Sequence, residues 1–237
     1  MKETNSENQL RSVFAGPLKR KSFLKYTALS GTVLVLGLES CKKSNHGGTS
    51  PGVIDVGSGD PGILNFAYAL EQLEAAFYIK VNASFYSNIT DAEKSVLTDI
   101  MNHEVAHRDF FKAALGSAAI PTLSFDFSSI NFSDRMSVLG TAKALEDTGV
   151  SAYNGAGQYI QNAAYLTLAG KIVSVEARHA SAIRDLLNPL SGDFAGDDVV
   201  DPATGLDFSR TPNAGSPSIV ATANTFLATK ISATQLP

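Results

Sequence analysis

The sequence predicts an all-α protein, with a four-helix bundle at residues 61–189 and a C-terminal extension at 190–237. Two observations indicate this fold. Apolar side chains recur at steps of three and four residues in four successive segments, which is the period of an amphipathic helix. The connections between these segments are short, long and short in turn, which is typical of two helical hairpins joined by one crossover. The hydrophobic content of 44% is sufficient for a packed core.

A signal peptide is predicted at residues 1–40. A basic run at 19–25 precedes an apolar stretch at 26–38. As a helix, this stretch would span about 20 Å, which is too short for a bilayer core of roughly 30 Å. A basic segment followed by a short apolar one is typical of a secretory signal. The alternative is a buried N-terminal helix that carries a cysteine by chance.

Two short motifs refine this prediction. Residues 20–25 resemble the twin-arginine export motif, with Lys21 in place of the second arginine. Residues 38–41 (Leu-Glu-Ser-Cys) resemble a lipobox, although Glu39 is unusual there. The resemblance implies an exported, periplasmic protein that is anchored to a membrane by a lipid on Cys41. Because Cys41 is the only cysteine, the chain can form neither an internal disulfide nor a thiolate metal cluster.

The segment after the signal peptide is predicted to be a tether. Residues 41–60 are polar and rich in Gly and Ser, a composition that favours a flexible linker. The first helix should then begin at Asp60 and Pro61, because Asp can cap free N–H groups and Pro fits the first turn. It is expected to end near Tyr86.

Three further helices follow. Thr90 and Glu93 form a capping-box pattern that begins the second helix, and Gly116 has the position of a glycine that ends one. The third helix is expected at about 133–154 and the fourth at about 163–187. The sequence thus supplies both helical hairpins.

The long connection at 117–132 decides how the hairpins are joined. Its roughly 16 residues could reach about 50 Å when extended. A helix of about 25 residues is only about 38 Å long, so the connection can cross the whole bundle. In the C-terminal extension at 190–237, only residues 217–229 have the pattern of a short helix.

Acidic and imidazole side chains occupy the inward faces of all four predicted helices. Buried carboxylates without partners are costly and repel each other, and cations between them would remove both penalties. Glu and His three residues apart project from one helix face, so both can reach the same ion. One Glu from each of two helices and Glu-x-x-His from each of the other two is the arrangement of di-metal carboxylate bundles. The candidate ligands are Glu71, Glu104, His107, Glu146, Glu176 and His179.

An internal repeat supports two matching hairpins. Ala-Leu-Glu ending at Glu71 is followed by Tyr78, and the same triplet ending at Glu146 is followed at the same spacing by Tyr153. Each tyrosine either hydrogen-bonds a ligand carboxylate or is an ordinary core aromatic. Glu74, one turn after Glu71, is a candidate alternative ligand or a residue that supports the ligands.

Two other interpretations remain open. His103-Glu104-Val105-Ala106-His107 matches the zinc-protease pattern H-E-x-x-H, in which both histidines bind zinc and the glutamate activates water. That interpretation leaves Glu71, Glu146, Glu176 and His179 unexplained. The second alternative is a metal-free bundle with buried Glu–His pairs.

Residues 64–78 resemble the first helix of the ferritin-like family that includes desiccation-related proteins, and the resemblance extends over about 61–190. It implies a bundle that holds two metal ions, and oxygen and imidazole ligands suit Fe or Mn better than copper. Relatives with this ligand plan oxidise Fe(II) with O2 or peroxide. We therefore expect an oxidoreductase that acts in stress defence in the cell envelope. The alternative is a non-catalytic desiccation-related envelope protein.

The distribution of charge along the chain limits the binding partners that we expect. The net charge is −4, and six of the 19 basic residues lie within the first 41 positions, so the predicted folded part is the more acidic. Such a surface attracts cations and gives no reason to bind nucleic acid. The expected partners are metal ions, O2 or peroxide, a membrane through Cys41 and, in a homodimer, a second copy of the chain.

Overall fold

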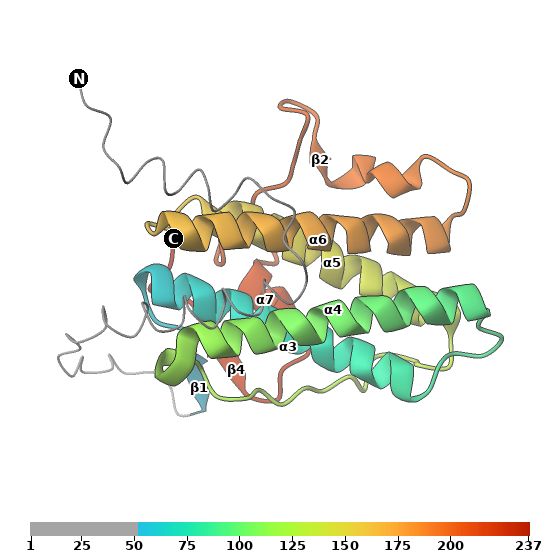
Figure 1. The fold of residues 1–237 in the computed structure, drawn as a ribbon, viewed down its shortest axis with the longest axis horizontal. Coiled ribbons are helices and arrows are strands. Elements are labelled where there is room, and N and C mark those ends of the chain that lie inside the picture. Colours follow the sequence, from blue (N-terminus) through green and yellow to red (C-terminus); the bar gives the residue numbers. More distant parts are fainter. Residues whose placement is uncertain (1–51) are drawn as a thin grey trace, which may run out of the picture. The chain divides into compact units, whose positions relative to one another are not determined.

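The computed structural model describes residues 52–237. The predicted signal peptide, the motifs within it and Cys41 lie outside the described residues. The predicted all-α bundle with a C-terminal extension is confirmed (Figure 1). Among the described residues, no helix is both long enough and apolar enough to cross a membrane. The four bundle helices are α3 (Gly59–Ala83), α4 (Asp91–Leu115), α5 (Arg135–Gly157) and α6 (Ala163–Leu187).

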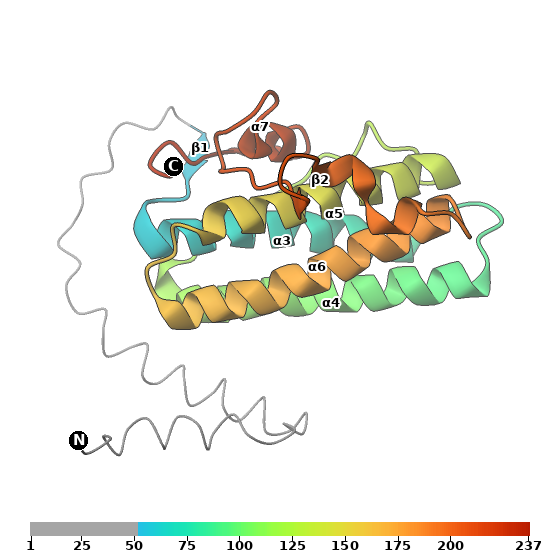
Figure 2. The same ribbon diagram turned by 90° about the horizontal axis from the view of Figure 1, so that it is seen from above.

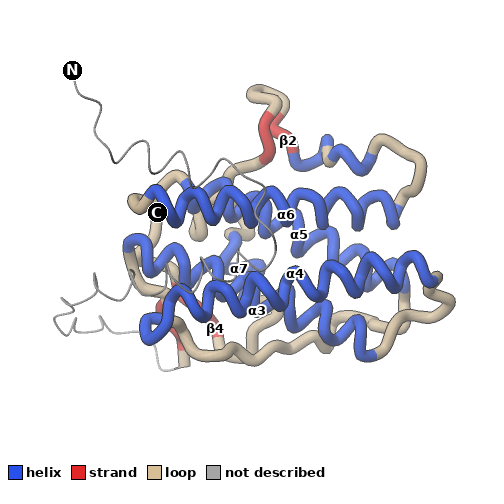
Figure 3. The backbone as a smooth tube through the Cα atoms, viewed as in Figure 1, coloured by secondary structure: helices blue, strands red, loops and turns tan. Residues whose placement is uncertain are grey.

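The four helices form two hairpins joined by one crossover. Helix α3 packs against α4 and α5 packs against α6, and the hairpins meet along α3–α5 and α4–α6 (Figure 2). After the short 3-10 helix η2 (Gly116–Ala118), the chain runs as a loop along the length of the bundle to α5 (Figure 3). Two buried side chains of α3 fasten this loop. Asn65 Oδ1 accepts the N–H of Ile120, and Gln72 Oε1 accepts the N–H of Leu123, each at 2.9 Å.

The predicted capping signals around α4 are confirmed. The Thr90 hydroxyl accepts the N–H of Glu93, while the Glu93 carboxylate accepts the N–H of Thr90. Gly116 follows the last turn with a φ of 54°, a conformation that favours glycine. The helix therefore begins and ends where the sequence predicts.

The prediction that Asp60 caps its own helix is wrong. Ser58 occupies the N-cap position of α3, and Asp60 lies inside the first turn. Its two carboxylate oxygens instead accept the N–H groups of Gln161 and Asn162, at 2.8 and 2.9 Å. Asp60 thus joins the start of the first hairpin to the link between α5 and α6.

The range predicted to be a tether contains ordered structure in the part that is described. Residues 53–55 form strand β1 (Val53–Asp55), which pairs in parallel with β4 (Lys230–Ser232), and Ile54 lies opposite Ile231. Val56, directly after β1, is buried. Val56 is part of the core and Ile54 packs against it, so the folded unit begins before residue 61.

The C-terminal extension packs against the bundle. It contains the 3-10 helices η3 (Asp193–Ala195) and η4 (Asp197–Val199), strands β2 (Val200–Asp201) and β3 (Leu206–Asp207), helix α7 and β4. Helix α7 (Ile219–Asn224) is shorter than the predicted 217–229. It lies over the α3–α5 side of the bundle, where Ala223 lines a small cavity together with Leu73 of α3 and Leu145 of α5. The extension therefore completes the core on one side.

A glycine of α5 permits the closest approach of the extension. The N–H of Arg210 donates to the carbonyl of Ser151 at 2.9 Å, so the extension crosses directly over α5. A Cβ atom at Gly155 would lie 2.0 Å from the carbonyl oxygen of Arg210. Only glycine fits at this crossing.

Candidate metal centre

Four glutamates lie in the middle of the bundle, one from each helix. Glu71, Glu104, Glu146 and Glu176 all have an exposed fraction of 0%. Each occupies the inward stripe of its helix, among apolar residues that form the core. The two histidines follow one turn after their glutamates on α4 and α6, so each Glu–His pair points toward the same interior region.

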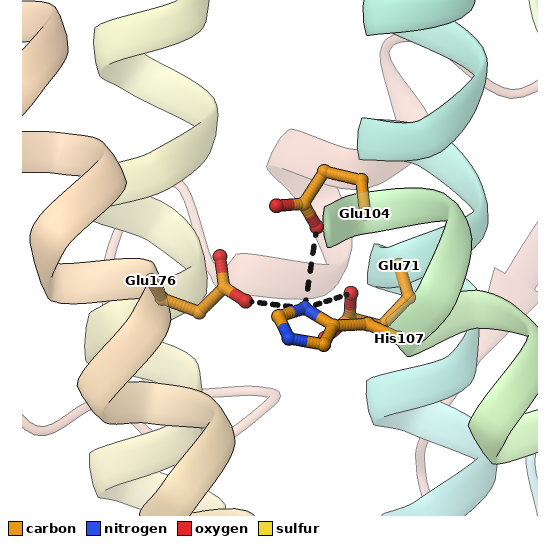
Figure 4. Close-up of side chains that lie close together, drawn as sticks. All are labelled: Glu71, Glu104, His107 and Glu176. Carbon is orange, nitrogen blue, oxygen red and sulfur yellow. Dashed lines mark ion pairs between the residues drawn. The ribbon is translucent and has the colours of Figure 1, made fainter. Parts of the chain in front are cut away.

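His107 is the centre of the first group. Its Nδ1 lies 2.8 Å from Oε1 of Glu176 and 3.3 Å from Oε2 of Glu71 (Figure 4). Oε2 of Glu104 lies 3.6 Å from the same nitrogen. Figure 4 shows the three carboxylates arranged around this imidazole from α3, α4 and α6. These four residues can offer ligand atoms to a single ion.

His179 is the centre of the second group. Its Nδ1 lies 2.8 Å from Oε1 of Glu104 and 3.5 Å from Oε2 of Glu146. Oε2 of Glu176 is also 3.5 Å away. In each of the two groups, the candidate ligand atoms lie within 4.8 Å of one another.

Glu104 and Glu176 belong to both groups, and this defines the geometry of the centre. In each of them, one carboxylate oxygen faces His107 and the other faces His179. Glu71 and Glu146 each belong to one group only. The arrangement is therefore that of two shared carboxylates between two positions, each completed by one further carboxylate and one imidazole. The two halves have the same composition.

The carboxylate oxygens and imidazole nitrogens that face one another in the two groups lack directed hydrogen bonds. Both oxygens of Glu104 and of Glu176, and Nδ1 of both histidines, are buried without a hydrogen-bond partner among the described residues. Native interiors rarely leave so many polar atoms unsatisfied in one place. In each group, one such atom from every residue lies within 4.8 Å of the others. This fits ligands that a pair of cations would satisfy, and the donor set suits hard or borderline divalent metals.

The pKa values of the clustered glutamates and histidines are also shifted by burial and by their contacts. Burial, with the neighbouring Glu176, raises the pKa of Glu71 well above its usual range, and burial raises the pKa of Glu146 to about 8. Burial also acts against ionised Glu104, but close contacts with His107 and His179 lower its pKa to about 2. Burial lowers the pKa of His179, but contacts with Glu104, Glu146 and Glu176 outweigh it and raise the pKa to about 12. The raised pKa values of Glu71, Glu146 and His179 favour bound protons in the metal-free cluster, so metal binding should release protons.

The two tyrosines bind the carboxylates of the opposite hairpin. The Tyr78 hydroxyl donates to Oε1 of Glu146 at 2.5 Å, and the Tyr153 hydroxyl donates to Oε1 of Glu71. In each case the second oxygen, Oε2, faces a histidine. Of the two roles left open by the sequence, the structure supports hydrogen bonding to the candidate ligands. Each hairpin thus orients a carboxylate of the other.

Glu74 lies outside both groups. It is buried, with an exposed fraction of 3%, and its Oε2 has no hydrogen-bond partner among the described residues. It faces α5, where a Cβ on Gly149 would lie 3.1 Å from Oε1 of Glu74. Burial and nearby carboxylates, Glu176 first, raise its pKa well above the usual range. Glu74 therefore lies beside the cluster, in space that is free because residue 149 is a glycine.

His103 also lies outside both groups. Its Nδ1 is 2.9 Å from Nε2 of His179, on the side of that ring away from the cluster. In the zinc-protease interpretation, His103 and His107 would share one ion and Glu104 would activate water. Here Glu104 is fully buried between the two groups instead. The contact of His103 was not predicted, although its position one turn before His107 places it on the same side of α4.

The fold and the buried cluster together define a four-helix-bundle protein with carboxylate and imidazole groups suited to binding metal. The model of the ferritin-like domain family matches residues 59–189, more than half of the chain, and the protein belongs to this family. The comparison with curated proteins gives no significant match.

Proposed function

We propose that this protein binds two divalent metal ions, iron in the first place and manganese as the alternative. One observation carries the proposal: Glu104 and Glu176 each direct one oxygen to His107 and the other to His179. Such carboxylates can bridge two ions. Four ionised carboxylates with two neutral imidazoles carry four negative charges, which two divalent cations neutralise.

When bound, two iron ions would supply two electrons for the reduction of O2 or peroxide. The chain contributes the surroundings of that reaction. Tyr78 and Tyr153 hold the two unshared carboxylates, so these residues would keep their orientation when ions are bound. The apolar core around the cluster excludes bulk water. We propose that this chemistry removes peroxide or oxidises Fe(II).

The place of action is a further part of the proposal. The motifs at 20–25 and 38–41 support export in the folded state and a lipid anchor on Cys41. The protein would then act in the cell envelope, where peroxide arrives from outside the cell. Mass spectrometry of the membrane fraction tests this. A mature N-terminus at Cys41 that carries acyl chains supports the anchor, and an intact N-terminus opposes it.

Anaerobic loading with Fe(II), followed by peroxide, tests the metal chemistry. We expect about two ions per chain and a rise in Fe(III) absorbance after the addition. Glu104→Gln keeps the shape of a shared ligand but removes its charge, so it should lose both ions. Asp109→Asn makes the same chemical change at an exposed position of α4 and is the matched control.

Two outcomes would count against the proposal. If the folded wild-type protein binds no metal, the dinuclear centre is refuted. If it binds two ions but reacts with neither O2 nor peroxide, the redox role is refuted. The non-catalytic alternative, a metal-stabilised envelope protein, would then be favoured.

A further inference from the structure

The contact between His103 and His179 joins two imidazoles from different hairpins. Nδ1 of His103 on α4 lies 2.9 Å from Nε2 of His179 on α6. The two rings are nearly parallel, with centroids 5.1 Å apart and planes inclined by 16°. His179 is buried, whereas His103 is exposed. A partly buried ring pair thus lies between the cluster and the surface.

The two nitrogens of His179 have separate partners. Nδ1 faces the carboxylates, with Oε1 of Glu104 at 2.8 Å, and is the atom available to an ion. Nε2 faces only His103 among the described residues. The hydrogen bond therefore acts on the ring without competing for the metal position.

Metal binding at Nδ1 would fix the direction of this hydrogen bond. A neutral imidazole that gives its Nδ1 lone pair to a cation carries its proton on Nε2. Nε2–H can only donate, so Nδ1 of His103 must accept. A histidine ligand whose second nitrogen donates to a fixed acceptor keeps its tautomer and ring orientation, and it is the more basic ligand for that reason.

The other half of the centre lacks this support. The repeat that relates His107 to His179 relates His103 to Val175, which cannot accept a hydrogen bond. Among residues 52–237, no side chain is hydrogen-bonded to the outer nitrogen of His107. The ligands are matched between the halves, but the support behind the two histidines is not.

We propose that His103 is a positioning residue that makes the two metal positions unequal. It accepts the Nε2–H of His179 and orients this ring toward the position formed with Glu104, Glu146 and Glu176. That position then binds its ion more tightly than the position at His107. The inference rests on the proposed function, because it requires a pair of bound ions.

Titration with Co(II) under anaerobic conditions, followed by calorimetry and by absorbance, tests the proposal. The wild-type protein should bind two ions with different affinities. His103→Leu keeps the bulk but removes the acceptor, and it should weaken the tighter ion by about 10- to 100-fold. His103→Asn places an amide oxygen at the δ position and should restore most of the affinity. Asn102→Leu, an exposed change one residue away, is the matched control.

The outcomes separate this inference from the function on which it rests. If wild-type protein binds no Co(II), the dinuclear centre itself fails. If it binds two ions, but His103→Leu binds both as tightly as wild type, only the role of His103 is refuted. Equal weakening by His103→Leu and His103→Asn would also refute it, because the hydrogen bond would not be the cause.

A second measurement does not require a variant. In Zn(II)-loaded wild-type protein with 15N-labelled histidine, the spectrum should show His179 protonated at Nε2 and hydrogen-bonded to a neutral His103. A Zn(II)-bound His179 protonated at Nδ1 instead would overturn the proposal.

Discussion

The two hairpins of the bundle share one ligand plan but differ in the residues beside it. Glu71 and Tyr78 of α3 correspond to Glu146 and Tyr153 of α5. The two hairpins depend on each other, because each tyrosine hydrogen-bonds the glutamate of the opposite hairpin. Loss of a tyrosine in one hairpin would leave a buried carboxylate of the other without that hydrogen bond. Reciprocal contacts therefore couple the two copies of the repeat.

The differences occur beside the ligands, at positions where the contact between the hairpins is not reciprocal. Glu74 on α3 corresponds to Gly149 on α5 in the repeat. The two residues also lie next to each other, and the Glu74 carboxylate occupies space that is free because Gly149 has no side chain. His103 on α4 corresponds to Val175 on α6. The extension crosses α5 at Gly155, whose counterpart on α3 is the exposed Lys80. The halves of the bundle are therefore alike at the ligands and specialised around them.

The largest expected effect comes from removing a shared ligand rather than an unshared one. Glu176→Gln should weaken both ions by more than about 100-fold, because loss of a ligand exceeds the loss of a supporting hydrogen bond. Glu71→Gln and Glu146→Gln should each weaken one ion, the one on its own side. Metal content by elemental analysis after dialysis checks this. Loss of one ion from all three variants alike would contradict the shared arrangement.

The buried glutamates and histidines that the two hairpins contribute should make the metal-free protein less stable as pH rises. The pKa of Glu146 is about 8 in the folded state against 4.5 in the unfolded chain, so the folded state binds more protons between these values. The pKa of His179, about 12 against 6.5, acts in the same direction above pH 6.5. Glu104 acts oppositely, but only below about 4.5.

The free energy of unfolding should therefore fall between pH 5 and pH 8, on the order of a few kcal/mol, since one unit of pKa shift corresponds to about 1.4 kcal/mol. Urea denaturation in the presence of a chelator measures it. Added Zn(II) should reverse the trend, because the ion binds best where protons are fewest. If the stability of the metal-free protein is constant or rises over this range, the raised pKa values of Glu146 and His179 are contradicted.

Gly155→Ala should break the crossing that distinguishes α5 from α3. The new Cβ would overlap the backbone of Arg210, which cannot rotate away as a side chain would. We expect a loss of about 1–3 kcal/mol and release of the extension, visible as faster amide exchange after residue 200. Lys80→Ala, at the corresponding position of α3, is the control. It should lower the free energy of unfolding by at most about 1 kcal/mol. Unchanged exchange in Gly155→Ala would refute the crossing.

The smallest expected effect concerns Glu74 and Gly149. Alanine has a higher helix propensity than glycine by about 1 kcal/mol, but in the wild type its Cβ would lie 3.1 Å from Oε1 of Glu74. Gly149→Ala should therefore give no gain in wild-type protein and a gain of about 1 kcal/mol in a Glu74→Ala background. A double-mutant cycle by urea denaturation measures the coupling. Additive effects would show that the two residues do not constrain each other.

The sequence was sufficient to predict the bundle and the candidate ligands, because both depend on local spacing. Glu104 and His107 share a face whatever surrounds their helix, and the repeat identified Tyr78 and Tyr153. The contacts of Asp60 with the α5–α6 link, of β1 with β4 and of Gly155 with Arg210 join segments far apart in the chain. No local pattern reports such pairs. His103 was visible only as part of a zinc-protease motif, and its contact depends on the rotation of α6 relative to α4.

The pairing of β1 with β4 brings residues 53–55 and 230–232 together at one end of the bundle, where Gln235 also donates to Asp55 (Figure 2). Local opening that starts at either strand has to break the same short parallel ladder, so each strand stabilises the other. Proteolytic cleavage next to one strand should therefore be slowed by its pairing with the other.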